Sequence, residues 1–309
     1  MTRRVPVLLA CLALAGCSIG TPTSPASSGP CKPLPNATVA ADGPPAAIMR
    51  DLSGGPSEYL LGVPGGSVAR IEEATGFSAA RLGGGRVFFS VRRGATDQDI
   101  RAGKLGECAV TVGAGTMAEV DPQGRAVVVG ANGKWKLVDN TGKTVTDLVA
   151  PGGAWTGDGR LVEPVPNGAA LAVYDLSGAR HDVPLPKGTV PQGTLGPHQE
   201  LVASAAGIQA LDLDSGAIGP LGQKLQSQRT LSGSPDGAWI SFIDQDGTPQ
   251  LLNLGDGSTV ALPNFSPTVG TTWSRDSKWV AVQGLYGGVA FRVADRKVID
   301  MGSLIVVSW

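Results

Sequence analysis

The chain has 309 residues, of which 42% are hydrophobic, and it carries 25 Lys and Arg against 26 Asp and Glu. This balance leaves no basic excess to hold phosphates, which argues against nucleic-acid binding. The 45 glycines and 23 prolines interrupt the chain so often that almost no window beyond residue 45 is long enough for a stable helix. The composition therefore predicts an all-β fold.

The N-terminus has the order of an export signal: Arg3 and Arg4, then the apolar run Val5–Ala15, then small residues before a cysteine. The run is shorter than the about 20 residues that a membrane-spanning helix needs. The motif Leu14-Ala15-Gly16-Cys17 resembles the bacterial lipobox, in which the chain is cut before a cysteine that becomes lipidated. The resemblance implies a signal peptide over residues 1–16 and acyl chains such as palmitate on Cys17. The alternative is an ordinary signal with an incidental cysteine.

Export and lipidation place the chain on the extracytoplasmic face of the cell membrane, held there by its lipid anchor. Residues 17–45 are rich in Pro, Ser and Thr, a composition that cannot bury a core and stays extended and solvated. We therefore expect a tether over 17–45 and a folded domain over 46–309. Removal of Arg3 and Arg4 with the signal leaves 23 basic against 26 acidic residues.

Two cysteines remain in the processed chain, because Cys11 leaves with the signal and Cys17 is predicted to carry lipid. An even pair in an oxidising compartment favours a disulfide. A bond between Cys31 and Cys108 would pin the tether to the first complete repeat of the domain. Two unconnected thiols are the alternative.

A repeat of about 38 residues runs through the chain. Its clearest copies are Ser232–Phe242 and Trp273–Val282, and the aligned copies start at residues 81, 120, 155, 195, 233 and 273. Each copy indicates four short strands, with a tight Pro/Asp/Gly hairpin after the first. Four such strands in about 40 residues are typical of a β-propeller blade. The residues expected to form the repeat turns are Asp121, Asp158, Asp236 and Asp276.

The two ends of the domain predict one further blade. Residues 303–308 read as a lone first strand, whereas residues 58–63 and 67–72 read as second and third strands that lack a first. Joining them completes a seventh blade and leaves no open sheet edge. The sequence therefore predicts a β-propeller of about seven four-stranded blades, closed by N- and C-terminal strands in one blade.

The repeat resembles that of TolB-type, WD-like propellers, whose core is a Trp-Ser-Pro-Asp-Gly turn followed by an apolar strand. Ser234-Pro235-Asp236-Gly237 matches this turn, with Gly233 in place of the tryptophan. The copy at Trp273 keeps the Trp, Ser and Asp but not the Pro and Gly. The resemblance implies the fold and leaves the activity open, because propellers host many functions.

The sequence carries no recognisable catalytic or metal-binding motif. His181 and His198 lie beside Pro-rich turns, without a second His or Cys spaced for zinc. Gly142-Lys143-Thr144 ends like a phosphate loop but lacks its first glycine and its helix, which favours a hairpin turn. Residues 212–216 and 244–247 resemble calcium loops without the third acidic ligand and the distal glutamate, which favours ordinary turns. We therefore predict no metal, no cofactor and no catalytic residue.

Trp155, Trp273 and Trp309 recur at one column of the repeat, which favours packing between blades over a ligand cage. With an anchor and no catalytic motif, the sequence favours a binding or scaffolding lipoprotein. Its predicted partner is an envelope protein or a cell-wall ligand. The alternative is a secreted propeller enzyme, a hydrolase or lyase, with its site in the central funnel. A sensor domain for a membrane signalling partner is a third possibility.

Overall fold

The structure is a computed structural model of the chain. It describes residues 31–53, 59–72, 74, 80–94, 97–150, 152–221, 225, 230–265 and 267–309. The predicted signal peptide and the lipidation site Cys17 lie outside these residues. Within them the regular structure is all β, arranged as seven four-stranded antiparallel sheets. The same residues contain no helix long and apolar enough to cross a membrane.

Six of the sheets are each formed by four strands consecutive in the chain. The first contains β4 (Arg81–Gly83), β5 (Arg86–Arg92), β6 (Gln98–Lys104) and β7 (Val110–Ala114). The second contains β8 (Thr116–Val120), β9 (Ala126–Ala131), β10 (Lys134–Asp139) and β11 (Thr144–Leu148). The next two contain β12 (Ala154–Trp155), β13 (Leu161–Pro164), β14 (Ala170–Tyr174), β15 (Arg180–Pro184), and β16 (Val190–Leu195), β17 (Gln199–Ser204), β18 (Gly207–Asp212), β19 (Ile218–Pro220). The last two contain β20 (Leu231–Gly233), β21 (Trp239–Ile243), β22 (Pro249–Asn253), β23 (Thr259–Ala261), and β24 (Thr268–Trp273), β25 (Trp279–Gly284), β26 (Gly288–Arg292), β27 (Val298–Asp300).

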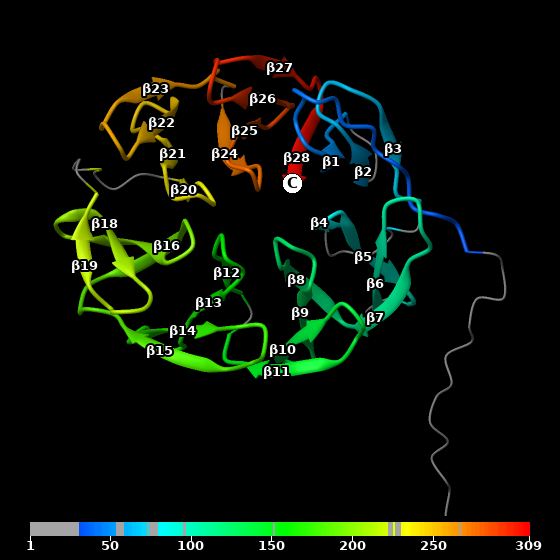
Figure 1. Cartoon of the computed structure of the whole chain (residues 1–309), viewed down its shortest axis with the longest axis horizontal. Coiled ribbons are helices and arrows are strands. Elements are labelled where there is room, and N and C mark those ends of the chain that lie inside the picture. The colour runs from blue at the N-terminus through cyan, green and yellow to red at the C-terminus, as the bar shows by residue number, and fades with distance from the viewer. Residues whose placement is uncertain are drawn as a thin grey trace, which may run out of the picture. The chain divides into compact units, whose positions relative to one another are not determined.

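The seventh sheet joins the two ends of the domain. In it β28 (Leu304–Ser308) is followed by β1 (Ala47–Asp51), β2 (Tyr59–Gly62) and β3 (Val68–Arg70). The innermost strands touch in the cyclic order β4, β8, β12, β16, β20, β24, β28 and back to β4. The sheets therefore form the seven blades of a closed propeller around a central axis (Figure 1). The predicted all-β propeller and its closure are confirmed.

One detail of the closure prediction is wrong. The strand beside β28 is β1, with Met49 opposite Val306 and Arg50 opposite Ile305. The predicted second and third strands, near 59–62 and 68–70, are in fact the third and fourth. Residues 47–49 of β1 are buried, whereas its last two residues, Arg50 and Asp51, are polar and partly exposed. Because so short an apolar segment has no alternation, the sequence pattern did not reveal this strand, although Gly54-Gly55-Pro56 between it and β2 is a turn signal.

The core lies between neighbouring blades. Phe88 and Ile100 of one blade pack on Val127 of the next, and Met49 packs with Trp279 across the seam between the last blade and the closing one. All five side chains are almost completely buried. Each large apolar side chain buried in this way contributes about 1.5–3 kcal/mol. Each blade therefore depends on its neighbours for a core.

A hydroxyl group shapes the hairpin after the first strand of a blade. Ser234 Oγ accepts a hydrogen bond from Trp239 N at 2.9 Å and donates one to Asp236 Oδ1 at 2.6 Å. Ser274 makes the equivalent bonds, including one of 2.7 Å to Asp276 Oδ1. In both copies the serine hydroxyl bonds to the aspartate and to a backbone amide of the same hairpin. The Ser-x-Asp pattern of the repeat therefore has a local structural cause.

The four predicted turn aspartates do not all occupy the same position. Asp158 lies where Asp236 and Asp276 lie, two residues after the hydroxyl residue Thr156, to which it is hydrogen-bonded. Asp121 instead takes the place of the hydroxyl residue, and its Oδ2 accepts a bond from Arg125 N at 2.9 Å. The alignment of the repeat brings these residues to the same turn but not to the same role.

The compact unit that contains the propeller runs from Lys32 to Trp309. Leu34 N donates to Glu107 O at 2.9 Å, Gly106 N donates to Leu34 O at 3.1 Å, and the Leu34 side chain is buried. This part of the predicted tether therefore lies against the β6–β7 hairpin. Cys31 and Cys108 are each disulfide-bonded. Their pairing with one another stays a prediction.

Candidate functional site

A pocket of about 540 Å³ lies on the propeller axis. It lies within the range of about 300–1,000 Å³ that is usual for small-molecule sites. Every innermost strand contributes to its wall. One residue from near the end of each of these strands lines it: Arg81, Glu119, Ala154, Thr194, Ser232, Thr272 and Ser308. We call these seven residues the axial belt.

Three of the belt hydroxyls are hydrogen-bonded, two of them to a neighbouring blade and one within its own blade. Thr194 Oγ1 donates to Trp155 O at 2.9 Å, and Ser308 Oγ accepts a bond of 3.0 Å from Leu82 N. Thr272 Oγ1 accepts a bond of 2.8 Å from the Gln283 side chain. The hydroxyl groups of Thr194, Thr272 and Ser308 therefore each have at least one partner within the propeller.

The tryptophans after the belt pack between blades, as predicted for their column. Trp273 is buried, and its Nε1 donates to Ser232 O at 3.1 Å and to Ser241 Oγ at 3.0 Å. Trp309 is also buried, and its Nε1 donates to Thr272 O at 3.1 Å. These bonds tie each tryptophan to the preceding blade, so that the tryptophans hold the strands that carry the belt.

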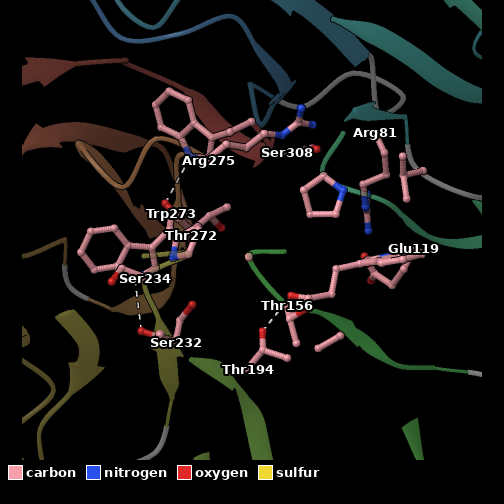
Figure 2. Close-up of a pocket in the computed structure, with 18 of the residues that line it drawn as sticks. Arg81, Glu119, Thr156, Thr194, Ser232, Ser234, Thr272, Trp273, Arg275 and Ser308 are labelled. Atoms are coloured by element: carbon pink, nitrogen blue, oxygen red, sulfur yellow. Dashed lines mark hydrogen bonds between the residues drawn. The ribbon is translucent and has the colours of Figure 1, made fainter. Parts of the chain in front are cut away.

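Two of the three charged residues of the pocket are arginines. Arg81 is on β4 and Glu119 on β8, the innermost strand of the next blade, and Figure 2 shows them on one side of the pocket, opposite Ser232 and Ser234. Arg275 lies in the turn after β24, and its guanidinium donates to the carbonyl oxygen of Leu82, the neighbour of Arg81. Arg275 therefore contacts the strand that carries Arg81.

These charges are poorly solvated. Burial raises the pKa of Glu119 above its ordinary value, and the charge of Arg81 only partly offsets this. Burial lowers the pKa of Arg275 to about 10, against the opposing effect of Asp121. Asp121 itself is engaged by Arg125, at 2.8 and 3.0 Å. Within the described residues, neither Arg81 nor Arg275 forms an ion pair with a carboxylate.

Neither histidine lines the pocket. His181 is on β15 and its Nε2 lies 3.1 Å from Leu213 O in the next blade. His198 Nδ1 lies 3.1 Å from Asp214 Oδ2 and 2.7 Å from a guanidinium nitrogen of Arg160. Arg160 also reaches Asp214 at 2.6 Å and thereby joins two neighbouring blades. Both histidines therefore take part in contacts between neighbouring blades.

The other motifs form turns. Asp212 Oδ1 accepts bonds from the backbone of residues 214 and 215, and Asp244 Oδ1 does the same for residues 246 and 248. Asp139 Oδ1 accepts bonds from Thr141 N and Lys143 N in the predicted hairpin. Across the part of the chain that the structure describes, no three His, Cys, Asp or Glu residues are grouped to hold a metal ion.

Sequence reasoning did not identify Arg81, Glu119 or Arg275 as candidate site residues. A signal was present in the repeat, because Glu119 directly precedes its predicted turn column at residue 120. A charged side chain at a column that faces the axis is exceptional when most other blades carry small or hydroxyl residues there. No such signal marks Arg275, because a charged residue in a turn is common in any protein.

No family model matches the chain, and no curated protein matches it. Hydrazine synthase of Kuenenia stuttgartiensis is similar in fold, with 16% identity and a TM-score of 0.41, over 59% of this chain and 64% of that chain. A chain of the mitotic checkpoint complex has 11% identity and a TM-score of 0.48, over 72% of this chain and 77% of that chain. These likenesses concern the fold alone. The fold and the pocket define a seven-bladed β-propeller with a polar axial site.

Proposed function

We propose that the chain is a lipid-anchored binding protein that holds an envelope protein or a cell-wall ligand at the axial pocket. The observation that carries this proposal is the pocket itself, to which all seven blades contribute a side chain. A pocket of this size with convergent polar groups is the usual form of a binding site. The blades provide a rigid frame, because each one is packed against its neighbours.

The anchor part of the proposal rests on the resemblance of Leu14-Ala15-Gly16-Cys17 to the bacterial lipobox. Two or more acyl chains on one cysteine hold a protein firmly, whereas one chain binds only marginally. In the Cys17→Ala variant we expect the chain to move from the membrane fraction to the soluble fraction. Cys11→Ala is the matched control and leaves the chain on the membrane. A Cys17→Ala variant that stays membrane-bound contradicts the anchor.

The binding part is tested by filling the pocket. Ser232→Trp places a large side chain in the axial belt, while Ser258→Trp places the same side chain on an exposed turn. Cells expressing each full-length variant are treated with a cross-linker, and the captured envelope material is identified by mass spectrometry. We expect Ser232→Trp to lose a component that the wild type and Ser258→Trp both retain. Equal capture by all three contradicts a role for the pocket.

One observation favours the alternative of a secreted hydrolase or lyase. Glu119 lies in the pocket with a raised pKa, which is the property of a general acid. Hydrolysis of a glycosidic bond normally requires a second carboxylate, and the described lining of the pocket has none. Incubation of cell-wall material with the wild type and with Glu119→Gln tests this alternative. Fragments released only by the wild type would support an enzyme, and no release by either contradicts it.

A further inference from the structure

We infer that the ligand of the axial pocket is a small, polyhydroxylated anion whose negative group binds between Arg81 and Arg275. This inference rests on the proposed function and narrows it to a class of ligand. Carboxylate and phosphate share the required chemistry, because both accept paired hydrogen bonds from a guanidinium group. The recognised molecule is of sugar-acid or sugar-phosphate size, which the cavity of about 540 Å³ accommodates.

The negative charge of the ligand follows from the balance of the pocket. The described lining holds two arginines against one glutamate, so its net charge is positive. Neither arginine forms an ion pair with a carboxylate among the described residues, because Glu119 and Asp121 act on Arg81 and Arg275 only at longer range, and burial makes the charged form of Arg275 less favourable. A partly buried cation that is not in contact with a carboxylate keeps part of its desolvation cost, which a bound anion would offset.

The position of the negative group follows from β4. The guanidinium of Arg275 is tied to Leu82 O, and Arg81 is the preceding residue of the same strand. Both cationic groups therefore lie at one side of the pocket. Glu119 lies on the adjacent strand β8 and repels an anion when it is ionised. The anion is therefore placed toward Arg275 and away from Glu119.

The hydroxyl groups of the ligand follow from the rest of the belt. Thr194 Oγ1 uses its proton on Trp155 O, so only its lone pairs remain to interact with a ligand. Ser308 Oγ points its proton toward Leu82 O, although that contact is long at 3.4 Å. Fixed acceptors of this kind match the O–H donors of a polyol. A neutral polyol satisfies only this half of the pocket, and a simple inorganic anion satisfies only the other half.

The experiment is calorimetric titration of the full chain in detergent with three probes. D-Gluconate and sorbitol differ mainly in that a carboxylate replaces a terminal hydroxymethyl group, and sorbitol 6-phosphate carries the other anion. We expect at least one of the two anions to bind about tenfold more tightly than sorbitol. The tighter anion identifies which of carboxylate and phosphate the pocket prefers. Equal binding of all three probes, or no saturable binding of any, overturns the inference.

Variants locate the binding. Arg275→Gln and Arg81→Gln are each expected to weaken anion binding about tenfold, whereas Arg275→Lys keeps part of it. Arg296→Gln, on the exposed β26–β27 turn, is the matched control and leaves the affinity unchanged. Glu119→Gln removes the repulsion and strengthens binding. Because Arg275 also bonds to Leu82 O, tryptophan fluorescence of each variant must show that it is folded. Anion binding unaffected by both arginine variants overturns the inference.

The two proposals fail differently. If Ser232→Trp abolishes capture of an envelope component while no anion binds more tightly than sorbitol, the anion is wrong and the binding function stands. If a small anion binds through Arg81 and Arg275 but capture is indifferent to Ser232→Trp, the pocket is a small-molecule site and not the site of that macromolecular contact.

Discussion

Replacing Glu200 with glutamine should remove a large part of the pH dependence of folding. Glu200 lies on β17 with only 3% of its surface exposed, and its Oε1 accepts a bond of 2.9 Å from Gly193 N. That amide belongs to a β-bulge, where the register between β16 and β17 shifts after Pro191 and Gly193 has a φ of 136°. Glu200 therefore stabilises an irregular part of an innermost strand.

Burial raises the pKa of Glu200 from 4.5 to about 8, against the effect of the backbone bond from Gly193. The unfolded chain loses the proton near pH 4.5, whereas the folded chain keeps it until about pH 8. Across this interval the folded state binds more protons, so the free energy of unfolding falls as the pH rises. At about 1.36 kcal/mol for each pH unit, the loss is about 5 kcal/mol as an upper limit.

The assay is urea unfolding, followed by tryptophan fluorescence, from about pH 5 to pH 8. Glu200→Gln keeps an acceptor for Gly193 N and carries no charge, so we expect a small, constant cost and a much flatter pH profile. Burial also raises the pKa of Glu163, to about 7, so that Glu163→Gln should flatten the profile only below that pH. Glu107→Gln, at an exposed position, is the control. A profile for Glu200→Gln as steep as that of the wild type refutes the reasoning.

Three further outcomes are expected. Arg160→Gln breaks a contact between blades and should lower the free energy of unfolding by about 1–3 kcal/mol, while Arg180→Gln, from an exposed ion pair, should cost less than about 0.5 kcal/mol; equal costs in urea unfolding would contradict this. Trp309→Phe removes the bond to the preceding blade and should cost about 1 kcal/mol, checked by thermal unfolding. Proteolysis without reduction should release two peptides, one with Cys31 and one with Cys108, joined by a disulfide. Mass spectrometry that finds each cysteine bonded elsewhere would refute the pairing.

The fold was predictable because the determinants of a blade are local. Turns such as Ser234–Gly237 recur at the period of the repeat, and their hydroxyl and aspartate groups are bonded within the turn itself. Turn residues that are fixed by local bonds therefore recur in the sequence at the period of the blade. The strand β1, of which only three residues are buried, pairs with β2 nearby but takes its place in the ring from its pairing with β28 at the far end of the chain. That pairing is non-local, so no short window of sequence contains it.

The candidate site was not predictable to the same degree, because its charged residues do not recur from blade to blade. The belt combines a cation at Arg81, an anion at Glu119, one alanine and four hydroxyl residues, each from a different blade. These positions are about 38 residues apart, and only closure of the ring brings them to one pocket. A motif search depends on fixed short spacings, and here the spacing reflects the blade and not the chemistry.

Neighbouring positions on the innermost strand differ in what they do in this propeller. On β24, Trp273 and Thr272 both line the pocket, but Trp273 is almost fully buried and bonded to the preceding blade. Successive residues of a strand face opposite sides. The packing column is therefore constrained by the contacts between blades, and part of the belt column is too, through the bonds of Thr194 to Trp155 O and of Ser308 to Leu82 N. Arg81 and Glu119 are the two belt positions that carry a charged side chain, and neither belongs to the buried core between the blades.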